Sequence, residues 1–309
     1  MRKEKLGPWL KITRLQFYPM SFVAYSLGAA IAGAKGLGFT SNTYLLGYVY
    51  LFLLELCAVL SNELWDLPTD RINRNASPFN GGSRVLVEGR LTPEEVRAFL
   101  RRVLCLLVGS GIWLLFICDA SSRTRVIVVL IAGVFMGLGY TVPPLKFCYR
   151  GLGELVVGLT HAPYVTLCGF VFQSGSWADP SPWIMSAPLF FAVLSAITLA
   201  GVPDQHADKR AFKKTLSVVF GEQTACLLAV VFATLAVVIG TLVWRFQVMG
   251  GSGGLLVVIA TPHWALLLIA IFVLVKSGSY DRRIDGIMQI ALSYILWFGM
   301  IPLVTFMKN

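Results

Sequence analysis

Nine long apolar stretches restrict what this chain can fold into. A helix of about 20 residues crosses the roughly 30 Å hydrocarbon core of a bilayer, and continuous apolarity without alternation favours helices over the strands of a transmembrane barrel. Composition agrees, since 56% of the 309 residues are hydrophobic and only 14% are charged, whereas soluble domains have about 25% charged residues. We therefore predict an all-α polytopic membrane protein with a single domain, residues 1–309, and nine transmembrane helices. The predicted spans are 17–37, 43–62, 98–118, 125–145, 152–173, 183–202, 224–243, 253–275 and 285–306.

Positive charge is distributed unevenly between the segments that connect these spans. The chain carries 26 Lys and Arg against 16 Asp and Glu, and 21 of the 26 cations fall on one side of the predicted membrane. Because cytoplasmic loops hold the excess of Lys and Arg, we expect the N-terminus inside and the C-terminus outside. The cations form no basic stripe on a polar domain, so we predict no nucleic-acid partner. The long charged loops 63–97 and 203–223 lie on the cytoplasmic side in this topology and should form the mouth of an active site.

The first of these loops opens with an acidic motif, SNELWDLPTDRINR. Its residues Asn62, Asp66 and Asp70 are spaced four apart, and each step of four advances about 40° around a helix, so the three side chains share one face. Pro68 cannot donate a hydrogen bond to the carbonyl of Leu64, which places Asp70 just beyond the regular helix. Acidic side chains on one face at a membrane boundary favour a hard cation such as Mg²⁺, which takes oxygen ligands.

A second acidic motif opens the other long loop, GVPDQHADKRAFKKTL, where Asp204 and Asp208 are again four apart. Asn62 and Asp204 are separated by 142 residues, as are Asp66 and Asp208. This equivalence indicates a parallel internal duplication about an axis along the membrane normal. Either motif alone is more often a solvated ion pair, but two equivalent clusters on one side predict a site that holds a diphosphate through bridging Mg²⁺.

Cations and one aromatic residue near these motifs are candidate substrate contacts. Lys146 and Arg150 follow the predicted fourth span and are suited to binding diphosphate oxygens, while Tyr140 would place a π-face or hydroxyl near a developing cation. The alternative is topology anchoring with an interfacial tyrosine. Arg71 and Lys209 directly follow a motif aspartate, which favours contact with phosphate.

Other polar residues admit two interpretations. The run 80–84, which ends in Arg84, is either a glycine-rich backbone nest that caps the site or a plain surface loop. Glu154 and His161 lie seven residues apart in the predicted fifth span, so either is a candidate contact for an aromatic acceptor, although a structural histidine is the commoner case. Glu55 also lies in a span and is assigned no role.

The paired motifs, N-x-x-x-D-x-x-x-D and D-x-x-x-D, resemble those of the UbiA superfamily of intramembrane prenyltransferases. The resemblance covers essentially the whole chain and includes the segments 79–91, 140–159 and 202–221. Within the superfamily the chain is most similar to the 1,4-dihydroxy-2-naphthoate prenyltransferases of menaquinone synthesis. Two departures stand out, since Glu63 follows the motif asparagine where Asp is more usual, and Phe212 stands where Gly commonly precedes the Lys-Lys-Thr-Leu run.

The resemblance implies nine helices and an active site that faces the cytoplasm, in an integral protein of a prokaryotic cytoplasmic membrane. It implies Mg²⁺-dependent transfer of an isoprenyl group from a polyprenyl diphosphate to an aromatic acceptor, with both the donor and the product embedded among membrane lipid. The expected metal ligands are Asn62, Asp66, Asp70, Asp204 and Asp208, and the four aspartates with Tyr140 are the expected catalytic residues. The expected substrate-binding residues are Asn62, Arg71, Arg84, Lys146, Arg150 and Lys209.

Three other activities remain open at this point. A prenyltransferase with a different acceptor or a membrane terpene cyclase would use the same metal chemistry, the cyclase trapping the allylic cation with the substrate's own double bonds. Only product analysis without an acceptor separates the cyclase from the transferase. A cation-coupled transporter would instead place carboxylates at mid-bilayer depth within inverted repeats. The one-sided acidic motifs in parallel repeats argue against transport.

Overall fold

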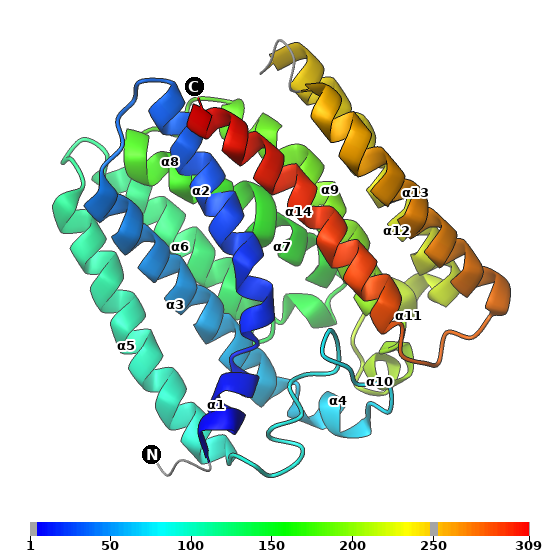
Figure 1. Ribbon diagram of the computed structural model, residues 1–309. Helices are drawn as coiled ribbons and strands as arrows, with labels where there is room; N and C mark the ends of the chain where they lie inside the picture. The colour runs from blue at the N-terminus through cyan, green and yellow to red at the C-terminus, as the bar shows by residue number, and fades with distance from the viewer. Residues whose placement is uncertain (1–4, 248–252, 309) are drawn as a thin grey trace.

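The computed structural model describes residues 5–247 and 253–308, and regular structure in those ranges is entirely helical. Long helices form a bundle, and short helices gather at one end of it (Figure 1). The long helices are α2 (Tyr18–Ala34), α3 (Ser41–Trp65), α5 (Pro93–Ile117), α6 (Arg123–Gly139), α9 (Ser181–Ala200), α12 (Glu222–Gln247), α13 (Gly253–Ser277) and α14 (Asp285–Lys308). One further span is built from α7 (Gly153–Leu159), a π-helical turn η4 (Thr160–Tyr164) and α8 (Val165–Ser174). The short elements are α1 (Leu6–Ile12), η2 (Leu15–Phe17), α4 (Leu67–Ile72), η3 (Phe147–Tyr149), α10 (Gln205–Arg210) and α11 (Leu216–Phe220).

Eight helices in the described ranges are long and apolar enough to cross a bilayer, so the expected count of nine is not confirmed. The difference arises at the predicted span 125–145, where α6 has 17 residues and measures about 25 Å at 1.5 Å per residue. The helix ends at Gly139 because Pro143 and Pro144 cannot donate backbone hydrogen bonds, and the chain turns into a loop before them.

The bundle is held together by close helix packing around small residues. Figure 1 shows α3, α5 and α6 on one side, α2, α8, α9 and α14 in the middle, and α12 and α13 on the other side. Where α2 meets α8, a Cβ at Gly28 would lie 1.8 Å from the carbonyl oxygen of Thr166, and one at Gly169 would lie 2.0 Å from that of Tyr25. Small residues therefore let the two backbones approach, as is typical of helices packed within a membrane.

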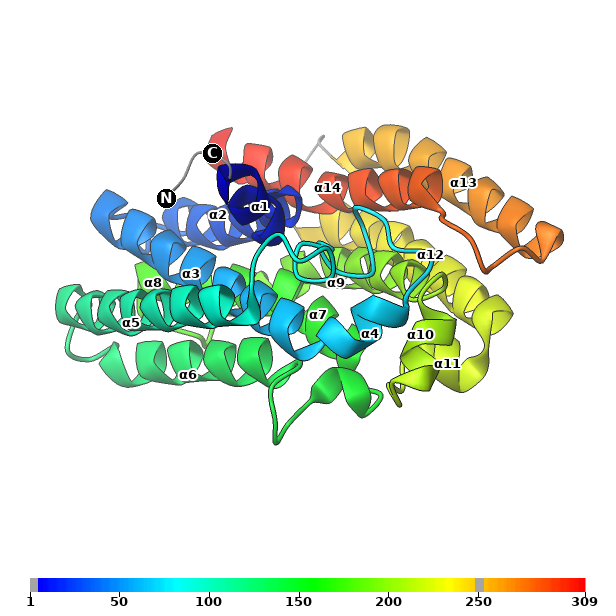
Figure 2. The same ribbon diagram turned by 90° about the horizontal axis from the view of Figure 1, so that it is seen from below.

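Both acidic motifs lie at the same end of the bundle. The first joins α3 to α4, and the second joins α9 to α10, so a long helix followed by a six-residue helix occurs twice. Figure 2, seen from this end, shows α4 beside α10 and α10 beside α11. The short helix α1 is also at this end, whereas the last turn of α14 lies at the opposite end (Figure 1). The fold thus gathers the charged segments on one face.

Candidate active site

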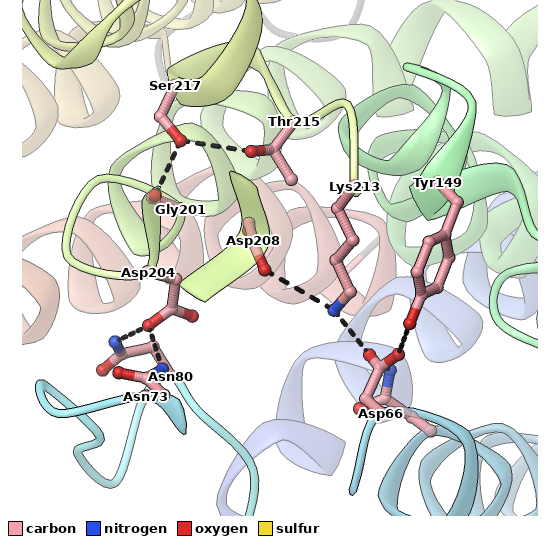
Figure 3. Close-up of polar contacts among 11 residues, drawn as sticks. Asp66, Asn73, Asn80, Tyr149, Gly201, Asp204, Asp208, Lys213, Thr215 and Ser217 are labelled. Atoms are coloured by element: carbon pink, nitrogen blue, oxygen red, sulfur yellow. Dashed lines mark hydrogen bonds and ion pairs between the residues drawn. The ribbon is translucent and has the colours of Figure 1, made fainter. Parts of the chain in front are cut away.

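The carboxylate of Asp66 receives donors from three different elements (Figure 3). The side-chain amide of Asn62 donates to Oδ2 at 2.8 Å, and the Tyr149 hydroxyl donates to Oδ1 at 2.8 Å. The ammonium of Lys213 also donates to Oδ2 at 2.8 Å. Helix α3 ends just before Asp66, whose backbone N–H still bonds to the carbonyl of Asn62, so the two motif residues stay one turn apart.

Lys213 joins the two motifs electrostatically. Its Nζ lies 2.8 Å from Asp66 and 3.7 Å from Oδ1 of Asp208, and all three side chains are at most 11% exposed. Burial acts to lower the pKa of the Lys213 ammonium, but the two carboxylates outweigh burial and hold this pKa well above its ordinary value. Lys213 is therefore a fixed positive charge between Asp66 and Asp208.

The neighbouring aspartates, if all were ionised, would carry more negative charge than the Lys213 ammonium balances. Burial, followed by the charges of Asp66 and Glu63, raises the pKa of Asp70 to about 8. Burial also raises the pKa of Asp208 to about 7, with Lys213 opposing the shift. A desolvated cluster in which carboxylates resist ionisation is stabilised by a further cation.

Asp204 is held from the opposite segment by two asparagines, as Figure 3 shows. The side-chain amide of Asn73 donates to its Oδ1 at 2.7 Å, and that of Asn80 donates to the same oxygen. These bonds connect the loop after the first motif to the first residue of the second motif. They fix the position of α10 relative to α4.

The glycine-rich run 80–84 folds against the first motif. Gly82 has φ +70° and leaves no room for a side chain, since a Cβ there would lie 2.2 Å from Oδ2 of Asp70. Ser83 donates to the Glu63 carboxylate through its N–H at 2.7 Å and its hydroxyl at 2.6 Å. Glu63, which replaces the usual Asp, is thus a buried anchor for this loop.

The predicted substrate-binding cations make different contacts around this cluster. Lys146 is half-buried, with Nζ 4.7 Å from the centroid of the Tyr149 ring. Arg84 donates to the backbone carbonyl of Asp70, and Arg150 donates to the carbonyl of Pro144 at 2.7 Å.

Two more predicted cations, Arg71 and Lys209, are exposed, and in the described part of the chain their side chains form no hydrogen bond or ion pair. Tyr140 is half-buried beside the cluster, close enough to Asp66 and Lys213 to interact electrostatically with both side chains. The roles assigned to all these residues stay predictions.

Three residues of the cluster were missing from the predicted site: Lys213, Tyr149 and Asn73. Lys213 belongs to a run of four cations within six positions, and spacing does not distinguish it from its neighbours. Its direction comes from Phe212, whose φ of +60° turns the chain back after α10 and lets the Lys213 N–H bond to the carbonyl of Asp208 at 2.9 Å. The only sequence signal was the unusual Phe at a position that commonly holds Gly.

The residues present fit a Mg²⁺ site completed by a substrate. Among described residues, no three His, Cys, Asp or Glu side chains converge closely enough to hold an ion by themselves. Mg²⁺ usually takes one or two carboxylates and completes its shell with water and substrate phosphates. The buried carboxyl groups of Asp70 and Asp208, whose raised pKa values favour a bound cation, match that partial ligand set.

Comparison with known proteins identifies the family. The chain matches the UbiA prenyltransferase family over residues 21–293. It belongs to this family. It is 28% identical to the 1,4-dihydroxy-2-naphthoate octaprenyltransferase of Bacillus subtilis over 243 residues, which cover 75% of this chain and 72% of the relative. It is 26% identical to the digeranylgeranylglyceryl phosphate synthase of Methanopyrus kandleri over 222 residues, with 71% and 72% covered.

A solved structure of a UbiA homologue from Archaeoglobus fulgidus, bound to GPP and Mg²⁺, has the same fold. It superposes with a TM-score of 0.56 at 15% identity and covers 94% of this chain and 99% of the homologue. The family predicted from the acidic motifs is therefore confirmed. The protein is a prenyltransferase and an integral membrane protein.

Proposed function

We propose that this UbiA-family prenyltransferase transfers an isoprenyl group from a polyprenyl diphosphate to an aromatic acceptor, with Mg²⁺ as cofactor and 1,4-dihydroxy-2-naphthoate as the first acceptor to test. The observation that carries the proposal is the buried junction where Asp66 and Asp208 share the ammonium of Lys213. Two acidic segments that meet at one end of an apolar bundle suit a ligand with a charged diphosphate head and a hydrocarbon tail.

The diphosphate head would lie among the motif residues. Asp66, Asp70, Asp204 and Asp208, assisted by Asn62, would hold Mg²⁺. Bound Mg²⁺ supplies neutralisation of the charge that develops on the leaving diphosphate. Lys213 and Lys146 add ammonium groups that donate hydrogen bonds to phosphate oxygens, and we assign the same role to Arg71, Arg84, Arg150 and Lys209.

The transfer step then follows from the surroundings of the head group. The allylic C–O bond breaks and its electron pair stays on the diphosphate, while a nucleophilic atom of the acceptor bonds to the freed carbon and the acceptor loses a proton. Asp66 is 3% exposed and Asp208 6% exposed, so the site holds little water to capture the cation. The rings of Tyr149 and Tyr140 would stabilise the allylic charge.

The acceptor class is supported by the relatives. The Bacillus subtilis relative is named for 1,4-dihydroxy-2-naphthoate, and a relative from Synechocystis, 27% identical over 274 residues, is named a 2-carboxy-1,4-naphthoquinone phytyltransferase. The A. fulgidus homologue was solved with GPP and Mg²⁺. The distribution of cations supports a site that faces the cytoplasm from the cytoplasmic membrane of a prokaryote, with the N-terminus inside and the C-terminus outside.

The direct test is incubation of the purified protein with Mg²⁺, a series of prenyl diphosphates and a panel of aromatic acceptors, followed by identification of products. We expect a prenylated acceptor and released diphosphate, both abolished by EDTA and by Asp208→Asn. Asp119→Asn is the matched control, because Asp119 is an exposed aspartate on the loop between α5 and α6. Absence of Mg²⁺-dependent diphosphate release with every donor would refute the proposal, and a cyclised hydrocarbon formed without acceptor would identify a cyclase.

A further inference from the structure

A second group of polar side chains lies inside the bundle, away from the acidic motifs. It comprises Tyr18 and Ser21 of α2, Tyr48 and Glu55 of α3, and His161 of η4, and we call it the intramembrane polar cluster. The Glu55 side chain is 13% exposed. Glu55 lies ten residues before the end of α3, or about 15 Å along the helix. An ionisable group at this depth is expensive to bury and usually has a function.

Glu55 and His161 face each other within this cluster. His161 Nε2 lies 3.9 Å from Oε1 of Glu55, while Nδ1 lies 3.0 Å from the carbonyl oxygen of Val157. An N–H on Nδ1 that donates to this carbonyl leaves Nε2 as the unprotonated nitrogen directed at Glu55. The separation is too long for a direct hydrogen bond. Each group therefore keeps a lone pair that this contact does not use.

The π-helical turn is the local reason for this placement. Residues Thr160–Tyr164 widen the helix between α7 and α8, and Pro163 within the turn supplies no backbone donor. Such turns are frequent at functional sites. Glu154, seven positions before His161, accepts a hydrogen bond from the N–H of Leu216 at 2.7 Å and so anchors α11. The two acids of the bundle interior have different partners.

The intramembrane polar cluster also contains an unpaired hydroxyl. Tyr18 is 4% exposed, and its hydroxyl has no hydrogen-bond partner among the described residues. Tyr18 and Tyr48 both lie close enough to Glu55 to interact with its charge, and Ser21 lies beside the carboxylate. The Tyr18 ring centroid is 5.0 Å from that of Phe52. A buried hydroxyl that lacks a partner, next to a carboxylate and aromatic rings, suits a planar ligand that carries its own hydroxyl.

We propose that the intramembrane polar cluster binds the hydroxyl-bearing acceptor and that Glu55 and His161 take the proton which the acceptor loses. This inference rests on the proposed function. The electron pair of the allylic C–O bond leaves with diphosphate, the acceptor forms the new bond to the allylic carbon, and its proton passes to the Glu55 carboxylate or to His161 Nε2. Glu55 precedes Asn62 by seven residues on one face of α3, about 10 Å away. In this proposal the diphosphate head and the first carbon of the prenyl chain must span that separation.

The test compares Glu55→Gln and His161→Asn with His263→Asn. His263 is a matched control, since it is another histidine in a spanning helix whose two ring nitrogens are bonded to the Ile290 carbonyl at 2.9 Å and the Trp297 indole N–H at 3.0 Å. In Glu55→Gln and His161→Asn we expect kcat/KM for the acceptor to fall about 100-fold or more. Stabilisation of the protein by GPP and Mg²⁺ against thermal unfolding should persist, and the loss should shrink with acceptors whose hydroxyl is made more acidic by ring substituents.

A second variant separates loss of acceptor binding from misfolding. Tyr18→Phe deletes only the unpaired hydroxyl, so we expect the ligand-free protein to be at least as stable as wild type while the KM for the acceptor rises several-fold. The inference is wrong if Glu55→Gln and His161→Asn keep kcat/KM within about twofold of His263→Asn, or if their loss is equal for all acceptors. Failure of the wild-type protein to transfer any prenyl group would instead refute the proposed function.

Discussion

Lys213→Met removes a cation that joins the two acidic motifs in the ligand-free protein. The Lys213 ammonium lies 2.8 Å from Asp66 and 3.7 Å from Asp208, and its side chain is 11% exposed. Methionine fills a similar volume without the charge. Two buried carboxylates then face each other with only neutral donors around them, so we expect the ligand-free protein to be destabilised.

The size of the effect follows from the contacts that remain. Breaking a buried ion pair by removing one partner costs about 3–5 kcal/mol. Asp66 keeps the donors of Asn62 and Tyr149, and each such bond is worth about 1 kcal/mol. We therefore expect a loss of about 1–3 kcal/mol, which corresponds to a fall in Tm of about 2–12 °C at the roughly 2–4 °C per kcal/mol typical of chains of about 150–250 residues. Mg²⁺ and a prenyl diphosphate should restore part of it, because they bring positive charge to the same carboxylates.

The assay is thermal unfolding of the detergent-solubilised protein, with and without Mg²⁺ and GPP. Lys214→Met is the control, since Lys214 is the exposed neighbour on the same segment. We expect Lys213→Met to lose stability without ligand and to gain more than wild type when Mg²⁺ is added. The reasoning fails if both variants unfold within about 1 °C of wild type, or if added Mg²⁺ stabilises Lys213→Met less than Lys214→Met.

Three further predictions concern the same end of the bundle. Burial raises the pKa of Asp70 from 3.8 to about 8, so a proton must leave before Mg²⁺ binds, and titration calorimetry between pH 6 and 8 should find Mg²⁺ affinity rising up to about tenfold per pH unit. A flat profile would contradict this. Gly82→Ala places a Cβ 2.2 Å from an Asp70 oxygen, so turnover should fall at least about tenfold, whereas Gly89→Ala, with φ +66° but open space around it, should cost only backbone strain. Phe212→Gly relieves a positive φ of 60° at a side chain that is 85% exposed and should raise stability by about 1 kcal/mol in a thermal melt; a lower Tm would show that Phe212 is held by something other than the turn.

The fold was predictable because membrane-spanning helices are recognised in a sequence by their length and apolarity. The helical class and eight of the predicted spans follow directly from that signal. The remaining span, 125–145, was overestimated because hydropathy does not detect where a backbone stops donating hydrogen bonds. The apolar run continues past Gly139, but the prolines at 143 and 144 end the helix there.

The candidate site was only half predictable for a different reason. Spacing of four residues identifies the side chains that a helix itself brings together, and Asn62 and Asp66 are bonded as that spacing requires. Contacts across the site come from loops instead. Asn73 reaches Asp204 over 131 positions, and Lys213 reaches Asp66 over 147, and no local pattern encodes such distances.

The departure at Phe212 links the sequence to the electrostatics of the site. A left-handed residue is needed there to reverse the chain after α10, and a residue other than Gly pays about 1–2 kcal/mol for that conformation. The reversal is what directs Lys213 at both motif carboxylates instead of at solvent, where its exposed neighbour Lys214 lies. Because leaving two buried carboxylates without their shared ammonium would cost about 3–5 kcal/mol, more than this strain, the turn persists with Phe. The position therefore tolerates an unfavourable residue only as long as both aspartates remain, and the strain at Phe212 and the charge of Lys213 should be coupled in a double-mutant cycle.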